Sequence, residues 1–259
     1  MKSQSEEKKY MPEISQKEVE ELRKTIQATS QKIIAENIEK MKKTDPNRPE
    51  AMKYFDEIAD FATREKEIRA AKEAGKKVIG YTCLFAPVEL ILAADAIPVR
   101  VNSGWYDASK LGDRIVPVEV CPMVRSTIGA KMIALSPYLE LSDALISVLT
   151  CDGMTKLGEI LSDYTPVWAM TIPRVKDSAQ SIRLWNEEIK SVKAQIEALT
   201  GNKIKAKQLK SAIERTQKAT KAFRRLQDFR KGPPVIMGRD AMLVNQTYMW
   251  DDIDRWTEK

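Results

Sequence analysis

Short apolar runs alternate with helix-like segments between residues 76 and 172 of this 259-residue chain. Four runs have the length and the branched apolar residues of buried strands: KKVIGYT (76–82), IPVRV (97–101), DALISVLT (143–150) and PVWAMTI (166–172). Helical patterns fall between them at 87–96, 122–136 and 153–164. Because strands that alternate with helices need crossover connections, this order predicts an α/β fold with a parallel, doubly wound, Rossmann-like sheet.

Helical periodicity flanks this region on both sides. Apolar residues recur at helical spacing from residue 16 to about 42 and from about 50 to 74, where Gly75 is the predicted end of the helix. Beyond Pro173, two more helical stretches, separated near Gly201, predict a helical hairpin. We expect four parts: an N-terminal helical segment (1–75), an α/β domain (76–175), the hairpin (176–232) and a C-terminal tail (233–259).

All three cysteines of the chain follow strand-like runs. Cys83 follows 76–82, Cys151 follows 143–150, and Cys121 follows RIVPVEV (114–120), where Pro117 favours an edge strand or an extended loop. A helical pattern begins within a few residues of each cysteine, and a helix N-terminus favours the thiolate form. The carboxyl ends of parallel strands share one edge, where ligands bind in open α/β folds, so we expect the thiols to meet there.

Several kinds of cysteine site are compatible with this pattern. Three separate, inert thiols are one alternative, and the odd count disfavours a disulfide framework. Structural zinc needs four ligands, and the sequence has no histidine and no C-x-x-C pair. Three thiolates with one open position suit an iron–sulfur cluster that faces a substrate. The absence of histidine also excludes Ser–His and Cys–His nucleophile pairs.

Composition narrows the classes of partner. The net charge is +6, but the 43 basic residues are interleaved with 37 acidic ones, and no nucleic-acid motif is present. We therefore expect no nucleic acid. No run of about 18 apolar residues and no secretory h-region occur, so we expect no membrane span and a cytoplasmic location. The phosphate-loop motif G-x-x-x-x-G-K-[ST] and the dinucleotide motif G-x-G-x-x-G are absent as well.

Three motifs in order resemble one enzyme family. GYTCLFAPVELILAADAIPVRV, CPMVRSTIG and CDGMTK, followed later by GRDAML, are similar to the N-terminal part of the 2-hydroxyacyl-CoA dehydratase and benzoyl-CoA reductase family. The resemblance runs from about residue 65 to the C-terminus. It implies a 4Fe–4S cluster bound by cysteine. Cys83 and Cys121 match the ligand motifs most directly, and Cys151 is the third expected ligand.

The resemblance also implies a reaction and partners. In this family a separate ATP-hydrolysing activator delivers a low-potential electron, and a ketyl radical of the CoA thioester permits loss of a 2-hydroxyl group or reduction of an aromatic ring. We therefore expect an acyl-CoA substrate, the activator or another electron donor, and a paralogous second subunit. From the resemblance we also expect that the tail (233–259) leads toward the family's second α/β domain and that this domain is missing here.

Two other functions remain open at this stage. One is a non-catalytic electron-transfer or accessory subunit of the same family, which holds a cluster but binds no acyl-CoA. The other is an unrelated protein with structural zinc or no metal, in a scaffolding or DNA-binding role.

Three further residues are candidates for catalysis. Glu89 lies near a helix start, where capping is an equally good explanation. Arg125, one turn after Cys121, is a candidate to hold a thioester carbonyl, a phosphate or a cluster sulfide, or to pair with a surface carboxylate. Ser126 is a candidate hydrogen-bond donor to the cluster or to its open ligand.

Overall fold

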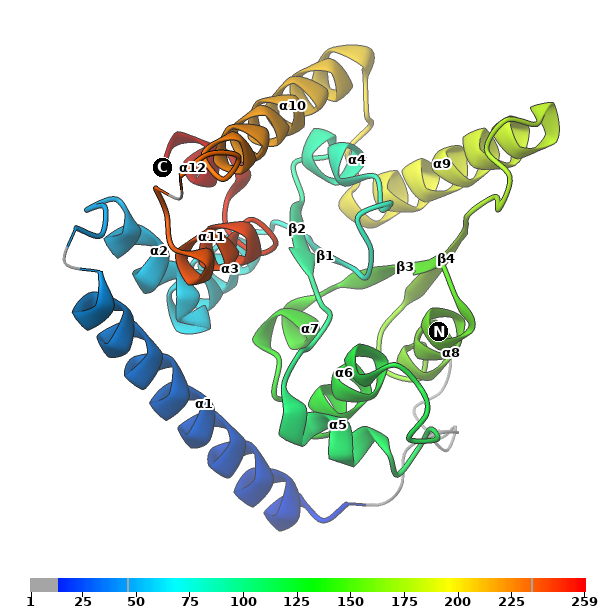
Figure 1. Cartoon of the computed structure of the whole chain (residues 1–259). Helices are drawn as coiled ribbons and strands as arrows, with labels where there is room; N and C mark the ends of the chain where they lie inside the picture. The colour runs from blue at the N-terminus through cyan, green and yellow to red at the C-terminus, as the bar shows by residue number, and fades with distance from the viewer. Residues whose placement is uncertain (1–13, 46, 234) are drawn as a thin grey trace. The chain divides into compact units, whose positions relative to one another are not determined.

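A four-stranded sheet organises the chain in the computed structural model, which describes residues 14–45, 47–233 and 235–259 (Figure 1). The strands are β1 (Val78–Tyr81), β2 (Ile97–Arg100), β3 (Ala144–Leu149) and β4 (Val167–Thr171), in the order β2-β1-β3-β4. β1 pairs in parallel with β3, and β3 in parallel with β4. Helices precede, separate and follow the strands, so the predicted α/β class with a parallel sheet is confirmed.

The helices in the described part of the chain match most of the helical patterns of the sequence. They are α1 (Gln16–Thr44), α2 (Met52–Ala59), α3 (Phe61–Glu73), α4 (Val88–Ala93), α5 (Tyr106–Gly112), α6 (Pro122–Met132), α7 (Pro137–Leu141), α8 (Asp152–Leu161), α9 (Ala179–Thr200), α10 (Ala206–Asp228), α11 (Gly238–Thr247) and α12 (Ile253–Glu258). Gly75 and Gly201 have φ angles of 93° and 72°, and each follows a helix end, as expected of glycines at that position. None of the described helices is long and apolar enough to cross a membrane.

The sequence patterns were wrong in three places. The single helix expected from 50 to 74 is two helices, because the Asp60 carboxylate accepts a hydrogen bond from the Ala62 amide (3.1 Å) and caps α3. The helices α5, α7 and α11 were not predicted. The strand expected at 114–120 is a series of turns, in which the amide of Val120 donates to the carbonyl of Pro117 (3.0 Å).

Two expectations fall partly outside the described residues. The N-terminal segment (1–75) includes residues 1–13, and the C-terminal tail (233–259) includes Pro234.

The chain forms two compact units, each assembled from segments that are distant in sequence. The first contains residues 14–29, 79–86 and 100–195, and the second contains 30–78, 87–99 and 196–259. All three cysteines therefore belong to the first unit.

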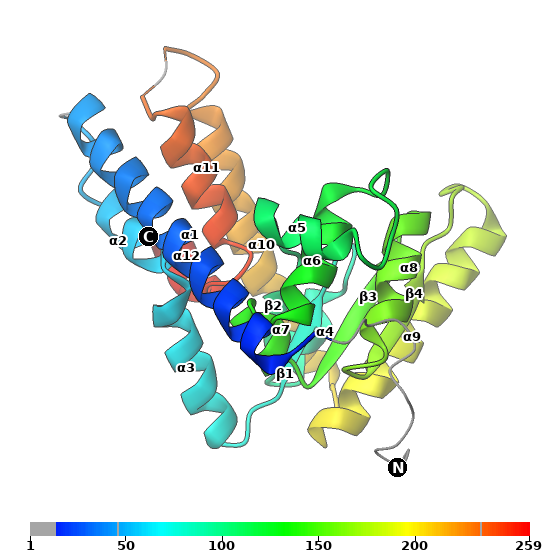
Figure 2. The same cartoon turned by 90° about the horizontal axis from the view of Figure 1, so that it is seen from below.

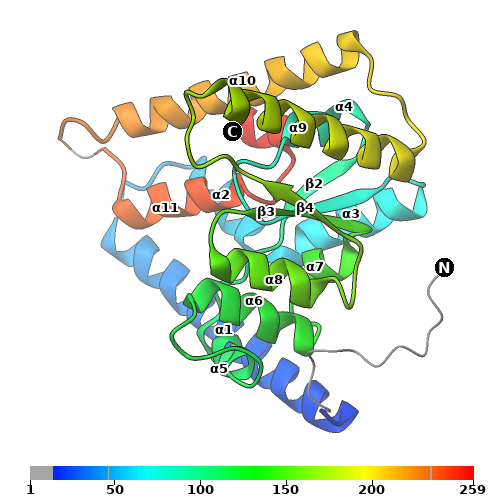
Figure 3. The same cartoon turned by 90° about the vertical axis from the view of Figure 1, so that its right-hand side faces the viewer.

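Close packing of α5 against α6 shapes the first unit (Figure 2). A Cβ atom on Gly129 of α6 would lie 1.8 Å from the Ala108 carbonyl oxygen of α5, so only glycine permits this approach. Ile26, Leu111 and Ile133 pack in the core beside these helices. α8 contacts β3, β4 and α6, so the helix that begins at Asp152 is fixed against both the sheet and α6 (Figure 3).

A buried ion-pair cluster supports the second unit, whose core includes side chains of α2, α10, α11 and α12. Nη1 of Arg48 lies 2.6 Å from Oδ2 of Asp56, and its Nε lies 2.9 Å from Oδ2 of Asp240. The side chains of Arg48 and Asp240 are only 8% and 2% exposed. Hydrogen bonds to both carboxylates raise the pKa of Arg48 above its ordinary value. Asp240 thus links the GRDAML motif to Arg48, which lies between α1 and α2.

Replacing Asp240 by Asn should destabilise the chain, because it leaves a buried guanidinium with one carboxylate instead of two. We expect the free energy of unfolding to fall by about 2–3 kcal/mol in urea denaturation. The control Glu50→Gln removes an exposed ion pair with Lys53 and should cost less than about 0.5 kcal/mol. Equal losses in the two variants would contradict a structural role for the buried cluster.

Candidate functional site

Cys83 lies where β1 ends. Thr82 extends the pairing of β1 with β3: its amide donates to the Ile146 carbonyl (3.2 Å), and its Oγ1 accepts from the Val148 amide (3.2 Å). Cys83 then begins a turn in which its carbonyl accepts from the Ala86 amide (3.0 Å). This half-buried cysteine is therefore at the carboxyl end of a strand, as predicted.

Cys151 lies just after β3, immediately before α8. Its carbonyl accepts from the amide (2.9 Å) and from Oγ1 (3.1 Å) of Thr155 in the first turn of the helix. The thiol itself makes no capping hydrogen bond to a helix amide, and the residue is exposed. Its sulfur is therefore available to a ligand at the start of a helix.

Cys121 reaches the same part of the first unit by a different route. It is exposed and immediately precedes α6, but it follows the turns at 114–120 instead of a strand. A Cβ atom on Gly153 of α8 would lie 3.7 Å from Cγ1 of Val120 and 3.9 Å from Sγ of Cys151. The residue before Cys121 and the sulfur of Cys151 thus border one small space, because α6 packs against α8.

Three free cysteine thiols are the type of donor that an iron–sulfur cluster needs. Among the described residues, no three Cys, Asp or Glu side chains lie close enough together to hold one metal ion. In an iron–sulfur cluster each cysteine binds a different iron atom, so the sulfurs lie farther apart than they do around one ion. Three free thiols in one unit, two of them exposed at helix starts, fit this donor set in chemistry.

Arg125 holds the segment that leads to Cys121. Its Nε donates to the Val120 carbonyl (2.8 Å), and its Nη1 donates to Oδ1 of Asp113 (2.5 Å) at the end of α5. The guanidinium therefore links α5, α6 and the loop between them. Asp113 was not singled out from the sequence, since nothing local connects it to a residue twelve positions later. A contact between Arg125 and a substrate stays a prediction.

Ser126 is 2% exposed and anchors a neighbouring loop. Its hydroxyl donates to the Trp105 carbonyl (2.9 Å) and lies 2.8 Å from the hydroxyl of Ser103. Next to it, Oγ1 of Thr127 accepts from the Ser103 amide (2.9 Å). Ser126 of α6 thus links this helix to residues 103–105. Its role in catalysis stays a prediction.

Glu89 belongs to the second unit, in the first turn of α4. Its Oε1 accepts a hydrogen bond from Oγ1 of Thr216 on α10 (3.0 Å). Burial raises the pKa of Tyr248, and the negative charge of Glu89 adds to this shift. The carboxylate therefore connects α4 to α10, in addition to its favourable position near a helix N-terminus.

Exposed apolar side chains flank two of the cysteines, a feature that the sequence analysis missed. Leu84 and Phe85 follow Cys83 directly, and Val118 lies three residues before Cys121; all three are exposed. The sequence signal for this feature is the pair of adjacent apolar residues that directly follows Cys83. Covered by another chain, such side chains would exclude water from the thiols.

Comparison with known proteins gives the family. Residues 83–259 match the family described as 2-hydroxyglutaryl-CoA dehydratase, D-component. Over 177 residues the chain is 31% identical to YjiM of Escherichia coli, a protein named as a dehydratase subunit; the match covers 67% of this chain and 45% of the relative. It is 25% identical to the (R)-phenyllactyl-CoA dehydratase beta subunit of Clostridium sporogenes, over 62% of this chain and 44% of the relative. It is 26% identical to a benzoyl-CoA reductase subunit of Thauera aromatica, over 56% of this chain and 39% of the relative.

The chain therefore spans less than half the length of these relatives, and the matched region includes all three cysteines. The resemblance found in the sequence motifs is confirmed: the chain belongs to the family of the 2-hydroxyglutaryl-CoA dehydratase D-component.

Proposed function

We propose that this chain is an iron–sulfur subunit of an activator-driven enzyme that dehydrates 2-hydroxyacyl-CoA thioesters or reduces aromatic acyl-CoA thioesters. Cys83, Cys121 and Cys151 would hold a 4Fe–4S cluster. The observation that carries the proposal is the space beside Gly153, which Sγ of Cys151 and the residue before Cys121 both border. The names of two relatives, a phenyllactyl-CoA dehydratase subunit and a benzoyl-CoA reductase subunit, support the class of reaction.

The residues around the thiols have roles that follow from their contacts. The first turns of α6 and α8 place partial positive charge beside Cys121 and Cys151, which would stabilise the negative charge of a bound cluster. Arg125 fixes the loop before Cys121 through Asp113 and Val120. When bound, the cluster supplies a low-potential electron to the CoA thioester.

Partner proteins are part of the proposal. The sequence lacks a phosphate-loop motif, so ATP hydrolysis would belong to a separate activator or electron donor. Relatives of the chain are named as subunits, and a paralogous second subunit would take part in the substrate site. The exposed Leu84, Phe85 and Val118 offer this partner an apolar contact beside the thiols.

A second candidate function is an electron-transfer or accessory subunit of the same family that binds no acyl-CoA. The two proposals differ in one measurable property. An enzyme subunit assembled with its partner should contribute to acyl-CoA binding, whereas an accessory subunit should leave acyl-CoA affinity unchanged when it is added.

Removing single thiols tests the cluster directly. After anaerobic reconstitution, Cys83→Ser, Cys121→Ser and Cys151→Ser should each retain less iron and sulfide per chain than the unsubstituted protein, because each loses one ligand. The control Thr150→Ser, beside Cys151, should keep the full content. Full iron content in both Cys83→Ser and Cys121→Ser would refute the proposal, and full content in Cys151→Ser alone would remove that residue from the ligand set.

The positioning role of Arg125 predicts a local change in dynamics. Arg125→Gln removes the bond to Asp113 and should raise amide hydrogen exchange in residues 113–121 about tenfold, as expected from the loss of about 1.4 kcal/mol of local stability. Amides of α8 should exchange as before. The control Lys110→Gln breaks an exposed ion pair with Asp107 on α5 and should leave the 113–121 segment unchanged. Unaltered exchange in Arg125→Gln would rule out the positioning role.

A further inference from the structure

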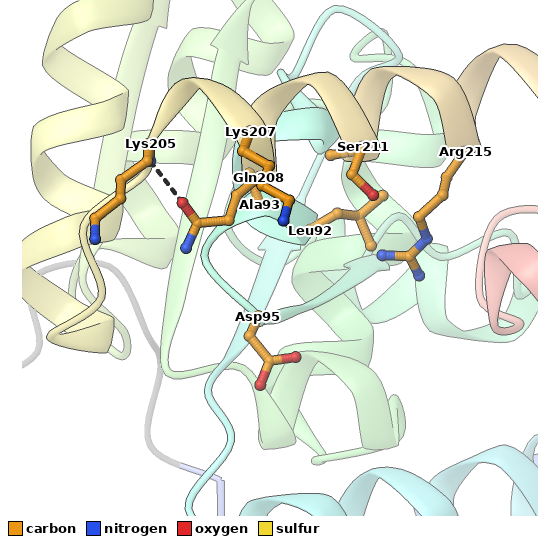
Figure 4. Close-up of a pocket in the computed structure, with 9 residues that line it drawn as sticks. Leu92, Ala93, Asp95, Lys205, Lys207, Gln208, Ser211 and Arg215 are labelled. Carbon is orange, nitrogen blue, oxygen red and sulfur yellow. Dashed lines mark hydrogen bonds between the residues drawn. The ribbon is translucent and has the colours of Figure 1, made fainter.

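A concavity of about 550 Å³ lies on the second unit, between α4 with the turn after it and the first half of α10 (Figure 4). Leu92 and Ala93 of α4 and Ala212 of α10 contribute apolar surface. Lys205, Lys207 and Arg215 contribute cationic side chains, and Asp95 is the single acidic lining residue. The volume is in the range of small-molecule sites.

The ion pairs of the lining residues do not neutralise all of their positive charge. Asp95 is paired with Lys76 (2.7 Å), and Arg215 is paired with Asp254 (2.9 Å). In the part of the chain that the structure describes, the ammonium groups of Lys205 and Lys207 have no carboxylate partner. The concavity therefore presents two uncompensated positive charges.

The position of these lysines is electrostatically unfavourable for the helix itself. α10 begins at Ala206, directly after Lys205, and its first turn contains no acidic residue. A helix N-terminus carries partial positive charge, so acidic residues stabilise it and lysines do not. In the same unit, α4, α11 and α12 have an acidic residue in their first turns, whereas α2 and α3 have none. A bound anion would relieve the repulsion at the start of α10.

Polar groups next to the lysines add directional contacts. Oε1 of Gln208 accepts a hydrogen bond from the Lys205 amide (2.9 Å), which leaves the side-chain NH₂ group of Gln208 as a donor. Ser211 lines the concavity one turn further along α10. Phosphate groups are recognised by cationic side chains together with amide and hydroxyl donors. An apolar surface beside these donors can contact the apolar end of the same ligand.

We propose that this concavity binds the diphosphate of a nucleotide-type ligand, with the phosphates at Lys205 and Lys207 and the base against Leu92 and Ala93. The nucleotide end of coenzyme A belongs to this chemical class. Where the ligand is coenzyme A, the site rests on the proposed function and would hold one end of its substrate; a site for another nucleotide goes beyond that function. It lies on the unit that contains no cysteine, so it requires no iron.

Calorimetric titration of the full chain at low ionic strength tests the site, with ADP, pyrophosphate, coenzyme A and adenosine as probes. ADP, pyrophosphate and coenzyme A should bind, and adenosine should bind much more weakly. The double variant Lys205→Gln/Lys207→Gln should weaken ADP binding at least about tenfold, since two charge-assisted contacts are lost. Lys205→Arg/Lys207→Arg keeps both charges and should retain most of the affinity.

The matched control is Lys210→Gln/Lys218→Gln, which removes the same charge from α10 at exposed positions outside the concavity. It should bind ADP like the unsubstituted chain. An equal loss of affinity in both double variants, unchanged affinity in Lys205→Gln/Lys207→Gln, or equal binding of ADP and adenosine would overturn the proposal. Cys83→Ser should leave ADP affinity unchanged, so failure of this site and failure of the cluster are separable.

Discussion

Parallel pairing of β1 with β3 fixes the positions of two of the three cysteines of this protein. Ile79, Gly80 and Tyr81 lie opposite Ala144, Leu145 and Ile146, and Thr82 continues this ladder by one residue. Since parallel strands end at the same edge, the residues that follow them are brought together although they are distant in sequence. Cys83 and Cys151 follow these two strands, so the sheet places both residues at its carboxyl edge.

Cys121 depends on a second constraint, the packing of helices. The close approach of α5 to α6 at Gly129 and the contact between α6 and α8 place the start of α6 beside the start of α8. Arg125 and Asp113 then hold the intervening loop. The third thiol is thus located by side-chain packing, and small changes in these contacts should move it relative to the other two.

The sequence predicted the parts of this arrangement that local patterns encode. Apolar runs separated by helical patterns predicted the parallel sheet. The ends of two of these runs predicted the positions of Cys83 and Cys151. The route to Cys121 was wrong, because RIVPVEV has the composition of a strand while Pro117 and the turns after α5 prevent pairing. The partners of Arg125, Ser126 and Glu89 were unpredictable, since each depends on a residue at least twelve positions away.

The central claim is that the three thiols of the first unit lie at one place on its surface. Spin labels attached to Cys83 and Cys121 in the Cys151→Ser variant measure this without iron. The account predicts strong dipolar broadening of the electron paramagnetic resonance spectrum, relative to the sum of the spectra of the two singly labelled proteins. A spectrum equal to that sum would place the thiols too far apart to share a cluster and would contradict the account.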